Sequence, residues 1–345
     1  KESGRCRLMS SLHKVAVLGA GAWGTALAAL LSKCGHDVTM WSYEAGVAEA
    51  INTEHINPYL GQAVLPETLR ATTDLAKAMD GATLVLSVSP SHFVRDVMTG
   101  AAKYMSDEAL VVSASKGIEL STLLRMDQVL DEILPAQVMD RFCVLSGPSF
   151  ATEVVSESPT AVVIAGRSAE AAAVAQLAFQ TPYFRVYTNT DVVGVELGGA
   201  LKNVMAVAAG ITAGLGYGHN TMAALITRGL AETTRLGVAM GAEVSTFSGL
   251  AGMGDLVLTC TGSLSRNRTV GFRLGQGEAL EAILGDMTAV AEGLKAAEAV
   301  HDLSKQHGVD MPIAEQVYQI VHEGKSPAEA LTDLMLRAPR PEKWS

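Results

Sequence analysis

Lys202 lies in an apolar stretch of sequence, where burial of a charged side chain costs free energy. It is the only charged residue between Glu196 and His219, and its neighbours are apolar and helical in character. Burial disfavours the charged form of a lysine and lowers its pKa, which makes the amine a usable acid or base near neutral pH. The sequence therefore predicts acid–base catalysis at Lys202, with a lysine that reaches water from the start of a helix as the alternative.

Lys116 and Asp255 are two further charged residues in unusual places. Lys116 comes just after the apolar run Ala109–Ala114, and Asp255 follows the glycine-rich turn Gly249–Gly254. A lysine at a strand end can face a substrate, or it can simply reach water. The carboxylate of Asp255 can orient a lysine or bind a substrate hydroxyl, and a helix N-cap or turn residue is an equally open interpretation.

Hydroxyl, amide and guanidinium groups are concentrated in the segment Thr259–Arg268. Within it, Ser265, Arg266 and Asn267 fall at an expected helix start, where free N–H groups and the helix dipole favour an anion. The chain carries a net charge of −10, so an anionic substrate needs a local basic pocket of this kind. We predict a phosphate site here. The alternative is a polar loop with surface arginines.

A glycine turn near the start of the chain points to a dinucleotide. Gly19, Gly21 and Gly24 fit the G-x-G-x-x-G spacing between an apolar strand and an apolar helix. The first glycine allows a tight turn, the second lets the backbone approach a pyrophosphate, and the third lets the helix pack on the sheet. The helix N-terminus then faces the phosphates. The alternative is a turn whose glycines serve packing alone.

Strands that alternate with helices must position these residues. The runs expected as strands are Val15–Leu18, Asp37–Ser42, Ala82–Val88, Ala109–Ala114, Phe142–Leu145, Thr160–Ala165 and Phe184–Tyr187, and the expected helices include Glu44–Thr53, Ser121–Ile133 and Ala169–Phe179. This alternation predicts an α/β fold with a doubly wound parallel sheet of the Rossmann-like type. Ligands of such sheets bind beyond the carboxyl ends of the strands.

The pattern changes near residue 191, where strand-like runs give way to long helical stretches. A chain of 345 residues is long for a single core, so two domains are expected. We predict a dinucleotide-binding domain at 13–190 and an all-helical substrate-binding domain at 191–345, with 1–12 as a tag or disordered leader. The glycines of the helical stretches, such as Gly198, Gly199, Gly210 and Gly214, predict close approach between helices or to a ligand.

Composition limits the class of protein. Apolar residues make up 48% of the chain and charged residues 18%, which is typical of a well-buried globular protein, and the excess of acidic residues argues against a nucleic-acid partner. Four well-separated cysteines without a C-x-x-C pair indicate neither a disulfide framework nor a metal site, so a cytoplasmic location is expected. Gly, Pro or charge interrupts the most apolar regions, so no membrane insertion is expected.

Together these segments give the chain a specific family resemblance. From His13 onward it resembles the soluble, bacterial-type family of NAD(P)-dependent glycerol-3-phosphate dehydrogenases. The segments that carry the resemblance are 19–26 (GAGAWGTA), 115–119 (SKGIE), 146–151 (SGPSFA), 199–204 (GALKNV), 249–256 (GLAGMGDL), 265–267 (SRN) and 290–293 (VAEG). It implies reversible hydride transfer between NAD(P)H and dihydroxyacetone phosphate, a supply of glycerol phosphate for phospholipid synthesis, and a homodimer.

The resemblance also implies a role for each matching residue. Lys202 would be the general acid/base, and Lys116 would be a second cation that polarises the carbonyl. Asp255 would hold the substrate hydroxyl and the lysine in register. The cofactor would contact Gly19, Gly21, Ala22, Trp23, Gly24, Ser42, Tyr43, Phe93, Lys116, Ala151, Arg266, Val290 and Glu292. The substrate would contact Lys116, Gly147, Ser149, Lys202, Asn203, Asp255, Thr259, Ser265, Arg266 and Asn267.

The choice between NAD and NADP stays open at this point, and use of both cofactors is expected. Glu44 is roughly where an acidic residue would bind the ribose 2′-hydroxyl of NAD, and neither Arg nor Lys adjoins it to accept a 2′-phosphate. Two other functions also remain open. One is a related two-domain dehydrogenase for another substrate such as a 3-hydroxy acid, and the other is a dinucleotide-binding sensor without turnover.

Overall fold

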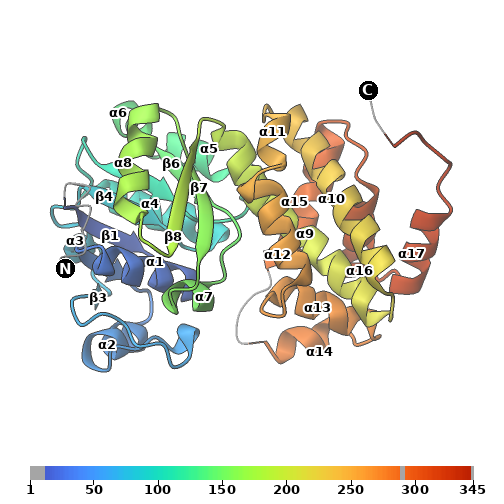
Figure 1. Ribbon diagram of the computed structural model, residues 1–345, viewed down its shortest axis with the longest axis horizontal. Coiled ribbons are helices and arrows are strands. Elements are labelled where there is room, and N and C mark those ends of the chain that lie inside the picture. Colours follow the sequence, from blue (N-terminus) through green and yellow to red (C-terminus); the bar gives the residue numbers. More distant parts are fainter. Residues whose placement is uncertain (1–11, 288–291, 343–345) are drawn as a thin grey trace, which may run out of the picture.

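The computed structural model describes residues 12–287 and 292–342. Among these residues, eight strands form one sheet in the order β3-β2-β1-β4-β5-β6-β7-β8 (Figure 1). The strands are β1 (Lys14–Leu18), β2 (Asp37–Trp41), β3 (Arg70–Thr72), β4 (Leu84–Ser87), β5 (Leu110–Ser113), β6 (Cys143–Ser146), β7 (Thr160–Gly166) and β8 (Phe184–Asn189). Strands β1, β4, β5 and β6 are buried along nearly their whole length, as expected for parallel strands covered on both faces.

Two features of the sheet correct the expectation from sequence. Strands β1 to β6 are parallel, but β7 runs antiparallel to β6, and β8 follows β7 in parallel. The connection from β6 to β7 contains only the five-residue helix α7 (Ala151–Val155), about 7.5 Å long at 1.5 Å per residue. Such a helix does not carry the chain back across the sheet, so β7 starts at the edge where β6 ends. The three-residue strand β3 was also missed.

Helices cover both faces of the sheet. They are α1 (Ala22–Lys33), α2 (Ala45–Thr53), the 3-10 turn η1 (Pro58–Leu60), α3 (Leu75–Met79), α4 (Ser91–Ala102), α5 (Met126–Asp131), α6 (Ala136–Met139), α7 and α8 (Ala169–Phe179). The predicted helix Ser121–Ile133 is wrong in its first part. Ile118 forms an antiparallel bridge with Arg125, and Leu123 has a left-handed φ of 58°, so a turn occupies this part.

The rest of the described chain is helical. Its helices are α9 (Val192–Gly214), α10 (His219–Ala239), α11 (Val244–Phe247), the π-turn η2 (Leu250–Gly254), α12 (Asp255–Thr261), α13 (Arg266–Gly275), α14 (Leu280–Gly285), α15 (Glu292–Gln306), α16 (Pro312–His322) and α17 (Pro327–Met335). Residues 1–11 of the predicted leader lie outside the described residues. Helix α9 begins within the predicted domain boundary, and Figure 1 shows it between the sheet and the other helices.

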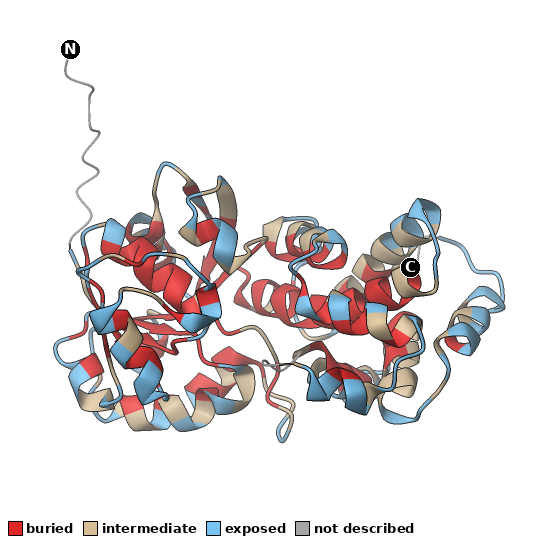
Figure 2. Cartoon of the chain, turned by 90° about the horizontal axis from the view of Figure 1, so that it is seen from below, coloured by how far each residue is buried: buried red, intermediate tan, exposed pale blue. Residues whose placement is uncertain are grey.

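Helix α9 is the core of the helical part. Its 23 residues are almost all buried, and Figure 2 shows buried residues at the centre of both parts of the molecule. By length and composition α9 could cross a membrane, which corrects the expectation that every apolar run is too short. However, 94% of its most apolar window is buried inside the protein. The start of α9 is shared with the sheet, because Val192 and Val195 pack in the same apolar cluster as Ala16 and Val111.

Candidate active site

The centre of the site is one carboxylate held by two lysines. Nζ of Lys202, on α9, lies 2.6 Å from Oδ1 of Asp255, the first residue of α12. Nζ of Lys116, in the segment after β5, lies 2.8 Å from Oδ2 of the same carboxylate. The two lysine side chains are only 9% and 16% exposed and that of Asp255 is 1% exposed, so all three charges are largely shielded from water. The three residues singled out for chemistry from sequence therefore meet at one point.

Two glycines of α9 allow this convergence. A Cβ on Gly198 would lie 2.4 Å from the carbonyl oxygen of Ala251 in η2, and a Cβ on Gly199 would lie 2.7 Å from Oγ of Ser146 at the end of β6. Glycine at 198 is therefore required for α9 to approach the turn that presents Asp255, and glycine at 199 leaves room for the Ser146 hydroxyl at the carboxyl edge of the sheet. Gly210 and Gly214 have the same function against the backbone of α13. The predicted use of these glycines for close approach is confirmed.

The surroundings of Lys202 set its proton affinity. Burial is the largest effect and lowers the pKa of Lys202 to about 8, against the opposite effect of the Asp255 carboxylate. The positive charge of Lys116 lowers it further. The ammonium group also donates to Oγ1 of Thr259 at 2.7 Å, and this hydroxyl donates to the Asp255 carbonyl oxygen at 2.6 Å. Lys202 is thus fixed in position and able to exchange a proton near neutral pH.

The predicted phosphate segment opens helix α13 beside this centre. Ser265 is the N-cap of α13 and its Oγ accepts from the N–H of Arg268 at 3.3 Å. Arg266 is exposed, and Asn267 is buried. Nδ2 of Asn267 donates to Oδ1 of Asn203, the neighbour of Lys202 on α9, at 3.0 Å. The segment therefore combines a helix N-terminus with the exposed guanidinium of Arg266. Its Asn267 amide is also bound to the amide of Asn203, the residue next to Lys202.

The glycine turn leaves donors free at the N-terminus of α1. Gly19 has φ of +135°, and a Cβ on Gly24 would lie 2.2 Å from the carbonyl oxygen of Gly19, whereas a Cβ on Gly21 would meet open space. The N-cap Gly21 has no side-chain cap, so the first N–H groups of α1 are available to a ligand. The indole Nε1 of Trp23 is buried without a hydrogen-bond partner. These donors fit a bound pyrophosphate, since anions bind at helix N-termini.

Lys116 connects the glycine turn to the reacting centre. Its Nζ lies 6.0 Å from the ring centre of Trp23, next to Ala22 in the first turn of α1. It also donates to the carbonyl oxygen of Gly147 at 3.2 Å, and Oγ of Ser149 donates to the same oxygen at 3.0 Å. Ala151 begins α7 directly after this loop. The carboxyl ends of β1, β5 and β6 thus contribute to one cleft.

The remaining predicted cofactor residues lie at other points of the same edge. Ser42 is buried just after β2, and Tyr43 beside it is 87% exposed. Phe93, in the first turn of α4, is 51% exposed, and its ring is tilted by 45° against that of His92 with 4.1 Å between the ring centres. Val290 lies outside the described residues.

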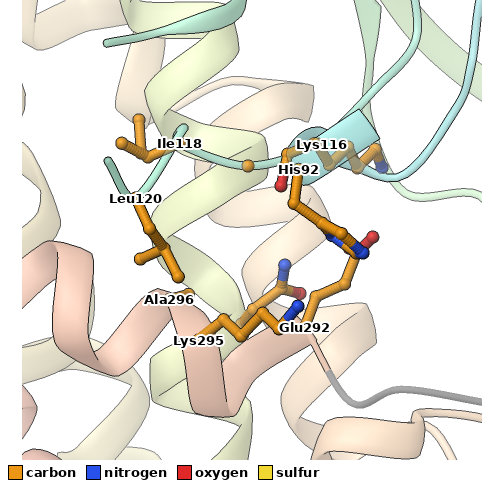
Figure 3. A pocket seen from close by; sticks show the side chains of 10 residues that line it. His92, Lys116, Ile118, Leu120, Glu292, Lys295 and Ala296 are labelled. Carbon is orange, nitrogen blue, oxygen red and sulfur yellow. The ribbon is translucent and has the colours of Figure 1, made fainter. Parts of the chain in front are cut away.

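Glu292 brings a carboxylate to the cleft from the first turn of α15. Burial raises its pKa, and the positive charges of Arg266, Lys202 and Lys116 act against this rise. Figure 3 shows a pocket with Lys116 on one side and Glu292 on the other. The pocket is lined by Ser91, His92, Lys116, Gly117, Ile118, Leu120, Asn203, Glu292, Lys295 and Ala296. Glu292 therefore shares a pocket with Lys116 and is close enough to Lys202 and Arg266 for their charges to affect its pKa.

Comparison with known proteins identifies the family. A family model described as the NAD-dependent glycerol-3-phosphate dehydrogenase N-terminus matches residues 14–172, and the corresponding C-terminus model matches residues 191–332. The chain belongs to this family.

Other glycerol-3-phosphate dehydrogenases are similar over almost the whole chain. The glycerol-3-phosphate dehydrogenase (NAD(P)+) of Geobacter metallireducens is 57% identical over 332 residues, which cover 96% of this chain and 99% of the relative. The enzyme so named in Myxococcus xanthus is 53% identical over 94% of this chain and 98% of its own length. The crystal structure of glycerol-3-phosphate dehydrogenase from Coxiella burnetii has a TM-score of 0.89 at 39% identity and covers 94% and 99% of the two chains.

A more distant likeness shows the fold alone. D-mandelate dehydrogenase with NADH has a TM-score of 0.59 at 11% identity. The likeness covers 92% of this chain and 99% of that chain, so it extends over the whole two-part architecture.

One feature of this site was not predicted from the sequence. Nε and Nη2 of Arg95, on α4, donate to Oε1 and Oε2 of Glu119 at 2.8 and 2.7 Å. Glu119 is buried and three residues after Lys116, so this bidentate pair ties the Lys116 segment to α4. The signal available was an acidic residue three positions after the strand-end lysine. Its partner on α4 is not linked to it by any helical or strand periodicity.

Proposed function

We propose that this chain catalyses the reversible reduction of dihydroxyacetone phosphate to sn-glycerol 3-phosphate with NAD(P)H. The observation that carries the proposal is the buried arrangement of Lys202, Asp255 and Lys116, which lies between the dinucleotide turn and a helix N-terminus suited to phosphate. The family membership and the names of the relatives support the substrate and the cofactor.

When bound, NAD(P)H supplies the hydride that adds to the carbonyl carbon. Lys202 gives a proton from Nζ to the carbonyl oxygen as negative charge develops there, so the product is a neutral hydroxyl. Lys116 places a second positive charge beside that oxygen and stabilises the developing charge. In the reverse direction neutral Lys202 removes the proton of the hydroxyl. A pKa of about 8 for Lys202 allows both directions near neutral pH.

Asp255 and Thr259 position the acid. The carboxylate takes one hydrogen of each lysine and the hydroxyl of Thr259 takes another from Lys202, so Nζ of Lys202 retains one hydrogen for substrate. Ser265, Arg266, Asn267 and Asn203 bind the phosphate, and Gly147 and Ser149 line the cleft beside Lys116. Binding at the phosphate, away from the reacting carbon, orients the carbonyl against the lysines.

The dinucleotide is held by the free N–H groups after Gly21 and by residues at the carboxyl edge of the sheet. Gly19 and Gly24 shape the turn, Ala22 and Trp23 contact the phosphates and the nicotinamide side, and Ala151, Arg266 and Glu292 contact the cofactor from the other side. Val290 is assigned to the cofactor from its match to the family alone. Ser42, Tyr43 and Phe93 contact the adenosine part. These assignments combine the geometry of the described residues with positions matched to the family.

The simplest test follows absorbance at 340 nm after dihydroxyacetone phosphate is added to the purified chain and NADH or NADPH. We expect a decrease that depends on the triose phosphate, with sn-glycerol 3-phosphate as the product by chromatography. Tight binding of the dinucleotide with no decrease would identify a sensor without turnover. A decrease with unphosphorylated hydroxy-acid precursors in preference to the phosphate would identify the other class of dehydrogenase.

The proposal extends to organisation and physiological role. Residues 13–190 bind the dinucleotide and residues 191–345 bind the substrate, with both groups meeting at Asp255. The chain forms a homodimer through its helical part, where Val238 and Val244 are 43% and 62% exposed. It acts in the cytoplasm and supplies glycerol phosphate for phospholipid synthesis. Sedimentation of the purified chain tests the dimer.

A further inference from the structure

A buried asparagine fixes the turn η1 beside the glycine turn. Asn57 is fully buried, and its Nδ2 donates to the carbonyl oxygen of Ala20 at 3.0 Å and to Oγ1 of Thr25 at 2.7 Å. Its Oδ1 accepts from the N–H of Tyr59 at 2.9 Å. Both the oxygen and the nitrogen of this side-chain amide are therefore hydrogen-bonded, and they hold η1 against the β1–α1 turn.

Tyr59 uses this fixed position to hold a carboxylate. Its phenolic OH donates to Oε1 of Glu44 at 2.7 Å. Glu44 is the N-cap residue of α2, and its carbonyl oxygen accepts from Oγ of Ser42 at 2.9 Å. Both the backbone and the side chain of Glu44 are thus anchored. The hydrogen bond to Glu44 is also the main cause of the raised pKa of Tyr59.

The position of this carboxylate is informative. Glu44 is the third residue after β2, and the N–H of Gly19 donates to the carbonyl oxygen of Trp41, the last residue of β2, at 3.2 Å. The end of β2 therefore lies directly against the dinucleotide turn. In sheets of this type the ribose next to the adenine lies at this point, where a carboxylate accepts from a 2′-hydroxyl and repels a 2′-phosphate.

The basic residues of neighbouring elements are engaged elsewhere. Lys33, at the end of α1, pairs with Glu157 at 2.7 Å, and Lys77, on α3, lies 3.8 Å from Asp74. Arg70, at the start of β3, donates to backbone carbonyl oxygens of the segment before it. None of these cations is placed by its contacts to receive a 2′-phosphate beside Glu44.

We propose that Glu44 makes this chain prefer NADH over NADPH and that Tyr59 positions its carboxylate. The inference rests on the proposed function, because it assigns a preference within the proposed cofactor site. An anchored carboxylate gains a hydrogen bond from a 2′-hydroxyl, whereas a 2′-phosphate brings like charge to the same point and gains none. The family name covers both cofactors, and Glu44 is the residue of this chain that would decide between them.

The test measures binding of NADH and NADPH to the whole chain by calorimetry, without substrate. We expect NADPH to bind about tenfold more weakly than NADH, and the gap to narrow at high salt because the repulsion is screened. Glu44→Gln keeps the shape of the side chain and should bring the two dissociation constants within about threefold of each other. Glu49→Gln removes the same charge from an exposed position on α2 and should leave the ratio unchanged.

Tyr59→Phe tests the positioning role. It should reduce the discrimination partly, while unfolding temperature stays the same, because the carboxylate remains but is no longer anchored. Equal affinities in the unaltered chain, or an unchanged ratio in Glu44→Gln, would overturn the inference while leaving the dehydrogenase proposal intact. If neither NADH nor NADPH bound, both this inference and the dehydrogenase proposal would be overturned.

Discussion

The ammonium groups of Lys116 and Lys202 lie on opposite oxygens of one carboxylate, that of Asp255. One lysine comes from the sheet and the other from the central helix of the helical part. With Lys202 protonated, the two lysines and the carboxylate together carry a net charge of +1 and are shielded from water. A chain of net charge −10 thus presents a local cation to an anionic substrate.

Replacing Lys202 tests its role as the acid. We expect Lys202→Ala to lower kcat for triose phosphate reduction by about 10²- to 10⁴-fold, the usual contribution of a general acid or base. The circular dichroism spectrum should be retained. Lys103→Ala, a matched change at an exposed lysine after α4, should have normal turnover. If Lys202→Ala kept near-normal kcat, the role would move to Lys116.

The lowered pKa of Lys202 predicts opposite pH profiles for the two directions. Reduction needs the protonated amine, so its kcat should fall as the pH rises above the Lys202 pKa of about 8. Oxidation needs the neutral amine, so its kcat should fall as the pH drops below the same value. Initial rates at saturating substrate from pH 6 to 10 check this, and profiles with the same slope in both directions would contradict it.

Asp255→Asn removes the charge that holds the two lysines. Burial and the Lys116 charge lower the pKa of Lys202, and the Asp255 carboxylate is the main group that raises it, so its loss leaves the two lowering effects largely unopposed. We expect the high-pH limb of the reduction profile to move to lower pH and kcat to fall at least about tenfold. Asp80→Asn, at an exposed ion pair with Lys14, is the control. An unmoved limb would argue against the coupling.

The sequence identified the residues of the site better than the contacts between their side chains. The strand-end position of Lys116 and the apolar context of Lys202 were sufficient to select both residues. Their meeting at Asp255 was not predictable, because Lys116 and Asp255 are 139 residues apart and no periodicity relates them. The resemblance to the family linked Asp255 to a lysine and to the substrate hydroxyl, but it did not link the two lysines to each other.

The fold shows the same limit. Apolar runs identified most strands of the sheet, since parallel strands are buried on both faces and need no alternation. The reversal at β7 was missed because strand direction depends on where a connection ends, which composition does not record. The turn before Arg125 was missed because its residues are compatible with a helix and a tertiary bridge to Ile118 overrides that preference.

Arg266→Ala tests the phosphate site. Arg266 is exposed at the start of α13, where its guanidinium can bind a phosphate, so its loss should raise the KM for dihydroxyacetone phosphate at least about tenfold. Arg273→Ala is the control on the same helix, because Arg273 forms surface ion pairs with Glu278 and Asp286. An unchanged KM in Arg266→Ala would refute the phosphate assignment.

The pair of Arg95 and Glu119 offers a test of positioning without contact to substrate. Arg95 binds Glu119 through two hydrogen bonds and Glu132 through one, and Glu119 is buried whereas Glu132 is 54% exposed. Glu119→Gln leaves Lys116 in the chain but weakens the tie between its segment and α4. We expect kcat to fall about tenfold, because small displacements of a group near the reacting atoms are costly.

Glu132→Gln removes the same charge from the same arginine and separates positioning from general stability. We expect its kcat to stay within about twofold of normal, since a single exposed ion pair contributes little. Arg95→Lys should behave like Glu119→Gln, because lysine lacks the two-pronged geometry of the guanidinium. A fall in unfolding temperature with unchanged kcat in Glu119→Gln would assign the pair to stability alone. The bidentate contact to a buried carboxylate beside Lys116 favours the opposite result, a loss of kcat that the exposed pair does not reproduce.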